Sequence, residues 1–304
     1  MEYVKRFIET DDNFLNELVD STASSCPFCP SSVLSKSPKF TPELVPEGRI
    51  QVGEAVCFPS LFAHEDFNAI VVPTRSHALQ LNQMQPSMFV DAFKACLRYF
   101  ELVRSNSPEV KFATILMNFL PPAGSTIAHS HLQALASDIP FQSVDHLLEA
   151  SKAYWEQNGV SYWVDLVETE KRLGERYLGK TRNVDWLTPF APTGLNEVQA
   201  IVAGRSSLNQ LSGDDLEGLA EGLVRILKYY HDIGVRTFNA VICSAPLDGS
   251  LDHFAVSLRI VSRYGYKPRF VSDVWALQYL LGEQEVYGSP EETASKLRGY
   301  FQPG

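Results

Sequence analysis

Hydrophobic side chains recur at helical spacing in two long segments, residues 86–105 and residues 214–232. In the first segment these positions are Phe89, Phe93, Cys96, Leu97 and Phe100, and in the second they are Leu216, Leu219, Leu223, Ile226, Leu227 and Tyr230. Apolar residues three and four positions apart share one face of an α-helix. The pattern therefore predicts one long amphipathic helix in each half of the chain.

A different pattern follows each predicted helix. Apolar runs occupy residues 111–118 and 237–244, and alternating sequences occupy residues 129–137 and 253–262. Both patterns are typical of strands. Short strands grouped around a single helix predict an antiparallel sheet, and therefore an α+β fold.

Two segments ahead of the long helices form a weak internal repeat. Residues 69–81 read AIVVPTRSHALQL, and residues 199–211 read QAIVAGRSSLNQL. His77 of the first copy corresponds to Ser207 of the second. The repeat predicts two similar units, of which only the first carries the polar residues considered below.

Two further segments, residues 142–157 and 161–178, have the pattern of helices that join the two units. We therefore place the boundary near residue 160. This gives an N-terminal half of residues 1–160, which holds the candidate site, and a C-terminal half of residues 161–304.

The composition is that of an ordinary globular protein, since 45% of the 304 residues are hydrophobic and 20% are charged. The formal net charge of -10 argues against non-specific nucleic-acid binding, which needs a basic face. No apolar run approaches the roughly 18 residues that suggest a membrane span. The first residues also lack the apolar core of a signal peptide. We expect a cytoplasmic protein with neither a nucleic-acid nor a membrane partner.

Two of the five cysteines stand apart from the others. Cys26 and Cys29 form a Cys-Pro-Phe-Cys motif in a segment rich in serine and proline, whereas Cys57, Cys96 and Cys243 lie in the apolar surroundings of buried thiols. A CxxC pair in a reducing compartment is a metal-binding or a redox motif. A redox pair usually opens a helix after a strand, which favours a metal here. Two loop thiols without a function are the remaining alternative.

Histidines of the first half complete a candidate metal site. His77 follows a predicted strand, and His129 opens the His-Ser-His-Leu-Gln run at residues 129–133. Tetrahedral zinc commonly takes two cysteines and two histidines. We therefore predict a zinc site whose ligands are Cys26, Cys29, His77 and His129. In the alternative interpretation, His129 and His131 are both ligands of one metal and no covalent step takes place.

The second histidine of the run is free to react if the first binds a metal. A neutral imidazole is a good nucleophile toward phosphorus near neutral pH, because its ordinary pKa is about 6.5. His131 would attack, and Gln133, on the same face of the predicted strand, would stabilise charge on the phosphoryl oxygens. Asn118 would orient a substrate oxygen, and the backbone N–H groups around residues 124–126 would hold the phosphate.

Together these motifs resemble the galactose-1-phosphate uridylyltransferase family of the histidine-triad superfamily. The motifs that carry the resemblance are Cys26-Pro27-Phe28-Cys29, Arg75-Ser76-His77, Asn118, Gly124-Ser125-Thr126, His129-Ser130-His131-Leu132-Gln133 and Pro189-Phe190-Ala191-Pro192. The resemblance covers residues 26–282. It implies two histidine-triad-like units, each an antiparallel sheet with a long helix, related by a degenerate internal repeat.

The resemblance also implies a reaction of the kind used in galactose metabolism. A nucleoside monophosphate would pass between phosphorylated acceptors, such as a sugar 1-phosphate, through a covalent nucleotidyl-histidine on His131. Gln133 corresponds to the glutamine that hydrogen-bonds the transferred group. The remaining correspondences are Cys26, Cys29, His77 and His129 to structural zinc ligands, Asn118 and Thr126 to positions near the phosphates, and Phe58 and Ser60 to the wall around base and ribose. Family members are typically homodimers.

The sequence departs from the family pattern where substrates are recognised. The family's Asn-Asp pair is Ser60-Leu61 here, and its hexose-binding Lys and Tyr-Glu align with Asp273 and Gln278-Tyr279. A His-x-His pair that holds a second metal in some members is replaced by Ser257 and Arg259, so we predict no second metal. The identity of the nucleobase and of the sugar in the substrate therefore stays open.

Three functions are compatible with these residues. The first is a nucleotidyltransferase, with a nucleotide sugar or other nucleoside diphosphate derivative and a phosphate acceptor as its partners. The second is a phosphorylase of nucleoside diphosphate sugars or dinucleoside polyphosphates that uses inorganic phosphate. The third is a zinc-stabilised nucleotide-binding protein without turnover. A zinc hydrolase is disfavoured, because four protein ligands leave no open position for water.

Overall fold

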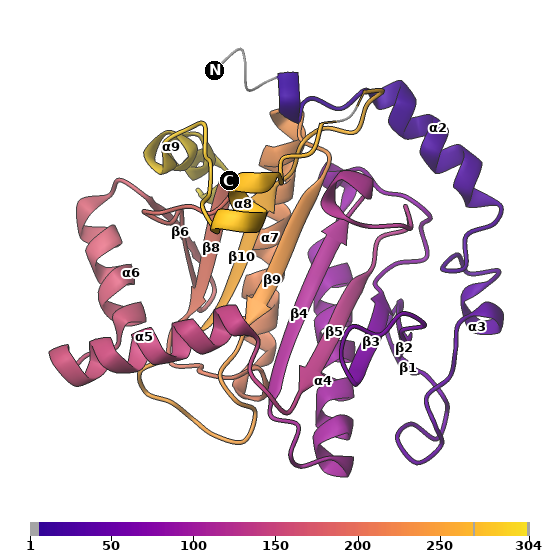
Figure 1. The fold of residues 1–304 in the computed structure, drawn as a ribbon, viewed down its shortest axis with the longest axis horizontal. Coiled ribbons are helices and arrows are strands. Elements are labelled where there is room, and N and C mark those ends of the chain that lie inside the picture. Colours follow the sequence, from indigo (N-terminus) through magenta and orange to yellow (C-terminus); the bar gives the residue numbers. More distant parts are fainter. Residues whose placement is uncertain (1–5, 270, 303–304) are drawn as a thin grey trace.

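The computed structural model describes residues 6–269 and 271–302, and one antiparallel sheet runs through this part of the chain (Figure 1). The strand order is β1-β2-β3-β5-β4-β9-β10-β8-β7-β6. The strands of the first half are β1 (Ile50–Val52), β2 (Ala55–Pro59), β3 (Phe67–Val72), β4 (Phe112–Phe119) and β5 (Leu132–Ser137). Those of the second half are β6 (Tyr177–Thr181), β7 (Val184–Leu187), β8 (Leu195–Val202), β9 (Phe238–Cys243) and β10 (Val256–Ser262).

The two halves meet where β4 pairs with β9, and the order of strands is the same on either side of this pair. On one side lie β5, β3, β2 and β1, and on the other lie β10, β8, β7 and β6. Two units of equivalent topology would produce this order. The predicted α+β fold with an antiparallel sheet is confirmed, whereas the repeat itself remains an interpretation of the sequence.

Two long helices cover one face of the sheet: α4 (Pro86–Asn106) and α7 (Gly213–Asp232), as the periodicity predicts (Figure 1). Pro86 suits the first turn of α4, and the Ser212 side chain caps α7 by accepting from the Asp215 N–H at 3.3 Å. Phe89 and Phe93 of α4 and Leu223 of α7 are buried in one core with the inward-facing strand residues.

The opposite face is covered only in part. Over the second half, Trp163 and Val167 of α6 (Tyr162–Leu173) pack on Leu187 and Ile201 of the sheet, beside α5 (Gln142–Asn158). Over the first half, the loop that holds Cys26 and Phe28 packs on the strands. Further helices are α2 (Asp12–Ala23), α3 (Val33–Lys36), α8 (Ala276–Leu281) and α9 (Pro290–Phe301), and 3₁₀ turns include η1 (Leu81–Gln83), η2 (Pro121–Ala123) and η3 (Leu208–Gln210).

Three predicted elements differ from the structure. The strand expected at residues 253–262 begins only at Val256. The alternating strand expected at residues 129–137 begins only at Leu132, so the His-Ser-His residues form the loop that leads into β5. The helix expected at residues 161–178 ends at Leu173, because Gly174 adopts a left-handed conformation (φ 69°) and β6 follows.

The predicted boundary near residue 160 falls between α5 and α6, and it remains a prediction. Among residues 6–269 and 271–302, no helix combines the length and the apolar character needed to cross a membrane.

Candidate functional site

Two cysteines and two histidines of the first half converge in the structure. Cys26 and Cys29 lie in the loop after α2, His77 follows β3, and His129 precedes β5. One ligand atom from each residue lies within 4.8 Å of the other three. His129 Nδ1 is 3.6 Å from Cys26 Sγ and 3.7 Å from Cys29 Sγ, and His77 Nδ1 is 3.3 Å from Cys29 Sγ.

Backbone carbonyls orient both imidazoles of this Cys/His cluster. His129 Nε2 lies 2.9 Å from the Thr74 carbonyl oxygen, and His77 Nε2 lies 3.1 Å from that of Val19. A carbonyl oxygen can only accept, so each Nε2 carries the ring proton and donates it. Each Nδ1 therefore presents its lone pair toward the sulfur atoms, in the way that a hydrogen bond from the other ring nitrogen orients histidine ligands in metal sites.

The spacing and the chemistry of the Cys/His cluster fit a tetrahedral metal ion. With zinc bonds of about 2.3 Å to sulfur and about 2.0 Å to nitrogen, the sulfur–nitrogen edge of a tetrahedron is roughly 3.5 Å. Burial raises the pKa of Cys29 to about 11, with a further rise from Cys26, and burial lowers the pKa of His129 to about 4. The imidazole is thus neutral, and a cation would offset the cost of two adjacent thiolates.

His131 lies outside the Cys/His cluster, although it is only two residues from His129. Its Nδ1 donates to the His129 carbonyl oxygen at 2.9 Å, which leaves Nε2 as the basic nitrogen. Burial lowers the pKa of His131, so this nitrogen is unprotonated near neutral pH. The Phe28 ring packs edge-on against the imidazole, with 5.2 Å between centroids. The interpretation of both histidines as ligands of one metal does not match this geometry.

A cleft of about 490 Å³ lies on the partly open face of the sheet. Gln133 and Asn118, both predicted from the sequence, line it. Its floor is apolar and includes Leu116 and Val241, which occupy the same row across the sheet as Gln133. The volume suits a small organic ligand, since such sites usually measure 300–1,000 Å³.

The predicted phosphate loop follows β4 in a constrained turn. Leu120 has a φ of 70°, an unfavourable value for leucine, and its carbonyl oxygen accepts from the N–H groups of Ala123 and Ser125. The Gly124 N–H donates to Pro121. Two of the three N–H groups predicted to hold phosphate are thus used within the turn. That of Thr126, whose side chain is exposed, remains available.

The two residues expected near a nucleobase differ in their access to solvent. Phe58 is 2% exposed and packs against Phe28, with 5.5 Å between ring centroids. Ser60 is partly exposed and donates to the Phe62 carbonyl oxygen at 3.1 Å, at the start of a loop in which Leu61 and Phe62 are exposed. A ligand can therefore reach Ser60 directly, but it would reach Phe58 only beside Phe28.

The far wall of the cleft comes from the second half and was not predicted from the sequence. Thr193, Glu197, Asn239 and Arg259 line it. Arg259 donates through Nε to Glu197 at 2.6 Å and through Nη2 to Thr193 Oγ1 at 2.7 Å. Charged residues inside otherwise apolar strands were the signal available in the sequence.

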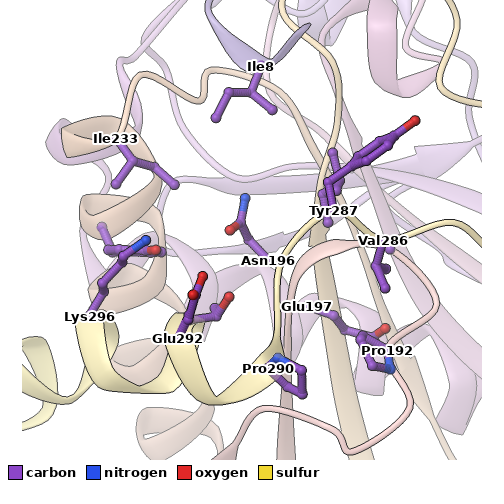
Figure 2. Close-up of a pocket in the computed structure, with 15 residues that line it drawn as sticks. Ile8, Pro192, Asn196, Glu197, Ile233, Val286, Tyr287, Pro290, Glu292 and Lys296 are labelled. Carbon is purple, nitrogen blue, oxygen red and sulfur yellow. The ribbon is translucent and has the colours of Figure 1, made fainter. Parts of the chain in front are cut away.

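A second pocket, of about 170 Å³, lies between β8, α7 and α9 (Figure 2). Asn196, Glu292 and Lys296 line it, together with Glu197, which it shares with the cleft. It is smaller than ordinary ligand sites, and none of the predicted site residues lines it. The cleft that Gln133 and Asn118 line is therefore the candidate active site.

Comparison with known proteins places this site in context. No family model matches the chain. An uncharacterized protein of Archaeoglobus fulgidus is 34% identical over 297 residues, which cover 97% of this chain and 87% of that protein. An ADP-glucose phosphorylase of Arabidopsis thaliana is 23% identical over 74% of this chain and 68% of its own length.

Solved structures are similar over nearly the whole chain. A GalT-like protein of Arabidopsis thaliana superposes with a TM-score of 0.75 and 19% identity, covering 90% of this chain and 91% of its own. The Arabidopsis ADP-glucose phosphorylase with bound ADP-glucose gives 0.74 and 18%, covering 90% of each chain. A uridylyltransferase gives 0.74 and 19%, covering 91% and 89%.

The sheet and the two long helices thus define an α+β protein with the fold of the galactose-1-phosphate uridylyltransferase-like proteins. Within this fold the chain belongs to the same family as the Archaeoglobus fulgidus protein. The similar proteins with functional names, a uridylyltransferase and an ADP-glucose phosphorylase, are enzymes.

Proposed function

We propose that this protein transfers a nucleoside monophosphate between phosphorylated acceptors through a covalent intermediate on His131. The observation that carries the proposal is the hydrogen bond from His131 Nδ1 to the His129 carbonyl oxygen. It fixes the tautomer whose lone pair is on Nε2, the nitrogen that must attack. The similarity to a uridylyltransferase and to an ADP-glucose phosphorylase supports the same chemistry.

In the first step, the Nε2 lone pair forms a bond to the α-phosphorus of a nucleoside diphosphate derivative. The bond from that phosphorus to the bridging oxygen breaks, and the leaving phosphate takes the electron pair. The Nδ1 proton stays in place, so the cationic nucleotidyl-imidazole keeps its bond to the His129 carbonyl. In the second step, an oxygen of the acceptor phosphate attacks the same phosphorus and Nε2 recovers its electron pair.

Two amides of the cleft would stabilise the transferring group. Gln133 follows His131 by two residues and lines the cleft, so its amide can donate to a phosphoryl oxygen. Asn118 lines the cleft from the neighbouring strand β4, and it can bind a second oxygen. The Thr126 N–H would contribute a third donor.

We further propose that the Cys/His cluster binds zinc as a structural ion. Four protein ligands would complete its coordination and fix the loop between Cys26 and Cys29. Phe28 lies in this loop and packs on His131. The metal would thereby hold the nucleophile in place without contacting the substrate. The residues of the Cys/His cluster match those implied by the family resemblance.

A second candidate is a phosphorylase that uses inorganic phosphate as the acceptor. The relative named ADP-glucose phosphorylase favours it. So does Asp273, which stands where the family has a hexose-binding lysine and which is engaged with Arg263 rather than free for a sugar. The step at His131 would be the same, and only the acceptor would differ.

Intact-mass measurement tests both candidates. The protein is incubated with a panel of nucleoside diphosphate sugars, beginning with ADP-glucose and UDP-glucose, and denatured without acid. A mass increase of one nucleoside monophosphate supports the covalent mechanism and identifies the base. Protection against unfolding by nucleotide, with no adduct from any sugar in the panel, would instead indicate a binding protein without turnover.

The acceptor is then identified by adding either inorganic phosphate or a sugar 1-phosphate to the isolated adduct. Loss of the adduct with release of a nucleoside diphosphate indicates a phosphorylase, and its loss with release of a nucleotide sugar indicates a transferase. We also propose a second copy of this chain as a partner, as the family resemblance implies. Light scattering would measure the mass of a dimer.

A further inference from the structure

We propose that Asn239 and Arg263 of the second half are positioning residues that turn the Asn118 amide into a hydrogen-bond donor for the transferring phosphoryl group. The inference rests on the proposed function. It concerns residues to which neither the sequence motifs nor the resemblance gives a role. A chain of four hydrogen-bonded side chains, Asp273, Arg263, Asn239 and Asn118, carries it.

The orientation of the Asn239 amide is fixed from two sides. Its Oδ1 accepts from Arg263 Nη1 at 2.5 Å, and a guanidinium can only donate. Its Nδ2 donates to the Ala123 carbonyl oxygen at 2.9 Å, and a carbonyl can only accept. If the Asn239 amide were flipped, its NH₂ group would face the Arg263 donor and its oxygen would face the Ala123 carbonyl oxygen. Asn239 therefore presents its NH₂ group to the first half.

This orientation determines which atom Asn118 offers to a ligand. The second hydrogen on Asn239 Nδ2 is donated to Asn118 Oδ1 at 2.6 Å. Asn118 must then direct its own Nδ2 elsewhere, and among the described residues no acceptor binds that nitrogen. Because Asn118 lines the cleft, its NH₂ group is available to an oxygen anion there. Phosphoryl oxygens need donors, so this polarity is the productive one.

The far end of the chain holds Arg263 in place. Asp273 accepts from Arg263 Nε at 2.5 Å and also pairs with Nη2, which is a bidentate contact. The side chains of Arg263 and Asp273 are only 18% and 13% exposed. Asn239 also contacts Ala123 directly, at the end of the turn that carries Gly124 and Thr126. The second half thus orients both the amide and the phosphate loop of the first.

The test compares two substitutions of Asn239 by the rate of adduct formation with ADP-glucose and UDP-glucose as probes. Asn239→Asp keeps the size of the side chain but offers only acceptors, so Asn118 flips and presents its oxygen to the phosphoryl group. We expect the saturating rate to fall about 100-fold, as when a transition-state donor is lost. Asn239→Ala leaves Asn118 free to turn, and we expect a loss of about 10-fold.

If Asn239 only filled space, Asn239→Ala would lower the rate more than Asn239→Asp, because Asp fills the space of Asn and Ala does not. The expected order of the two rates is the opposite. The matched control is Asn196→Asp, at a side chain that donates to Ser262 away from the cleft, and its rate should stay within about twofold of wild type. Arg263→Met, which removes the orienting donor but keeps Asn239, should lower the saturating rate about 10-fold, with a smaller change in the half-saturating concentration.

The inference is overturned if the wild-type protein forms an adduct and Asn239→Asp reacts as fast as wild type, or faster than Asn239→Ala. The proposed function would then still stand. If Asn239→Asp does not fold, an unchanged rate in Arg263→Met overturns the inference in the same way. A wild-type protein that forms no adduct with either probe overturns the proposed function, and the inference falls with it.

Discussion

Two segments of similar sequence, residues 69–81 and 199–211, lead from a strand into a long helix and are used differently. In the first, His77 turns its Nδ1 toward Cys29 Sγ, 3.3 Å away. In the second, Ser207 stands in that place, and its N–H donates to the Gln210 side chain at 3.2 Å, within η3. Segments of similar sequence thus carry a residue of the Cys/His cluster in one half and a turn residue in the other.

The partly open face of the sheet shows the same difference. The first half brings Gln133 and Asn118 to the cleft, and His131 precedes Gln133 by two residues. The second half brings Arg259, which forms an ion pair with the fully buried Glu197 carboxylate at 2.6 Å. A buried carboxylate needs such a partner. Under the proposed function, the first half therefore supplies the reacting groups and the second half supports them.

The strongest test of this comparison is His131→Ala. We expect adduct formation to fall by roughly 10⁴-fold or more, because the nucleophile is absent. Metal content should not change, because His131 is not part of the Cys/His cluster. The measurements are intact mass and metal analysis of the same sample. Ser257→Ala, at a buried position of β10 in the second half, is the matched control and should retain activity within about threefold.

Full activity in His131→Ala would rule out the covalent mechanism. A large loss in Ser257→Ala at unchanged stability would show that the second half also takes part in the chemistry.

A smaller effect is expected from Cys26→Ala, which tests the metal. Removing one of four ligands should lower the metal content from about one ion per chain to a small fraction. Because the ion would tie the loop around Phe28 to the sheet, the Tm and then the activity should fall with it. Cys243→Ala, at another buried thiol that lies outside the Cys/His cluster, should keep its metal. Unchanged metal content in Cys26→Ala would contradict the zinc assignment.

The smallest expected effect is on the stability of the second half and concerns Asp215, at the start of α7. Burial alone would raise the pKa of Asp215, but hydrogen bonds from Ser212, Arg205 and Asn183 outweigh it and leave the pKa below its ordinary value. The carboxylate therefore stabilises the fold above the ordinary pKa of about 3.9, and this contribution is lost as the pH falls through the lower folded value.

Asp215→Asn should accordingly lower the free energy of unfolding by about 1–3 kcal/mol at pH 7, and the difference from wild type should shrink below about pH 4. Urea denaturation at several pH values measures it. Asp214→Asn in the same turn is the control, because Asp214 is exposed and pairs only with Arg182, so its effect should stay below about 1 kcal/mol. A pH-independent difference for Asp215→Asn would contradict the assignment.

Local patterns predicted much of this fold. The periodicity of α4 and α7 gave both helices nearly to the residue, because apolar spacing reflects the face that a helix buries. Near the candidate site, the alternation of apolar and polar residues predicted the secondary structure less accurately. The His-Ser-His segment alternates like a strand, yet β5 begins at Leu132, because His129 turns toward the sulfur atoms before the strand starts.

The Cys/His cluster was also predictable, since CxxC and HxHxQ are local motifs. The proposed nucleophile, His131, lies in the second of these motifs and remains a prediction. Asn239 and Arg263 were not predictable, because their roles depend on the pairing of β4 with β9. Asn118 and Asn239 lie opposite each other in that pair, although 121 positions separate them. No local pattern carries this register, which tertiary packing sets.

The pairing of β4 with β9 also determines how far the chain can be shortened. Without the second half, β4 would be an exposed edge whose free N–H and C=O groups invite pairing with another chain. We therefore expect a fragment that stops in α5 to self-associate along this strand. We expect the complete ten-stranded sheet to be the smallest unit with the proposed activity, and we expect the first half alone not to substitute for it.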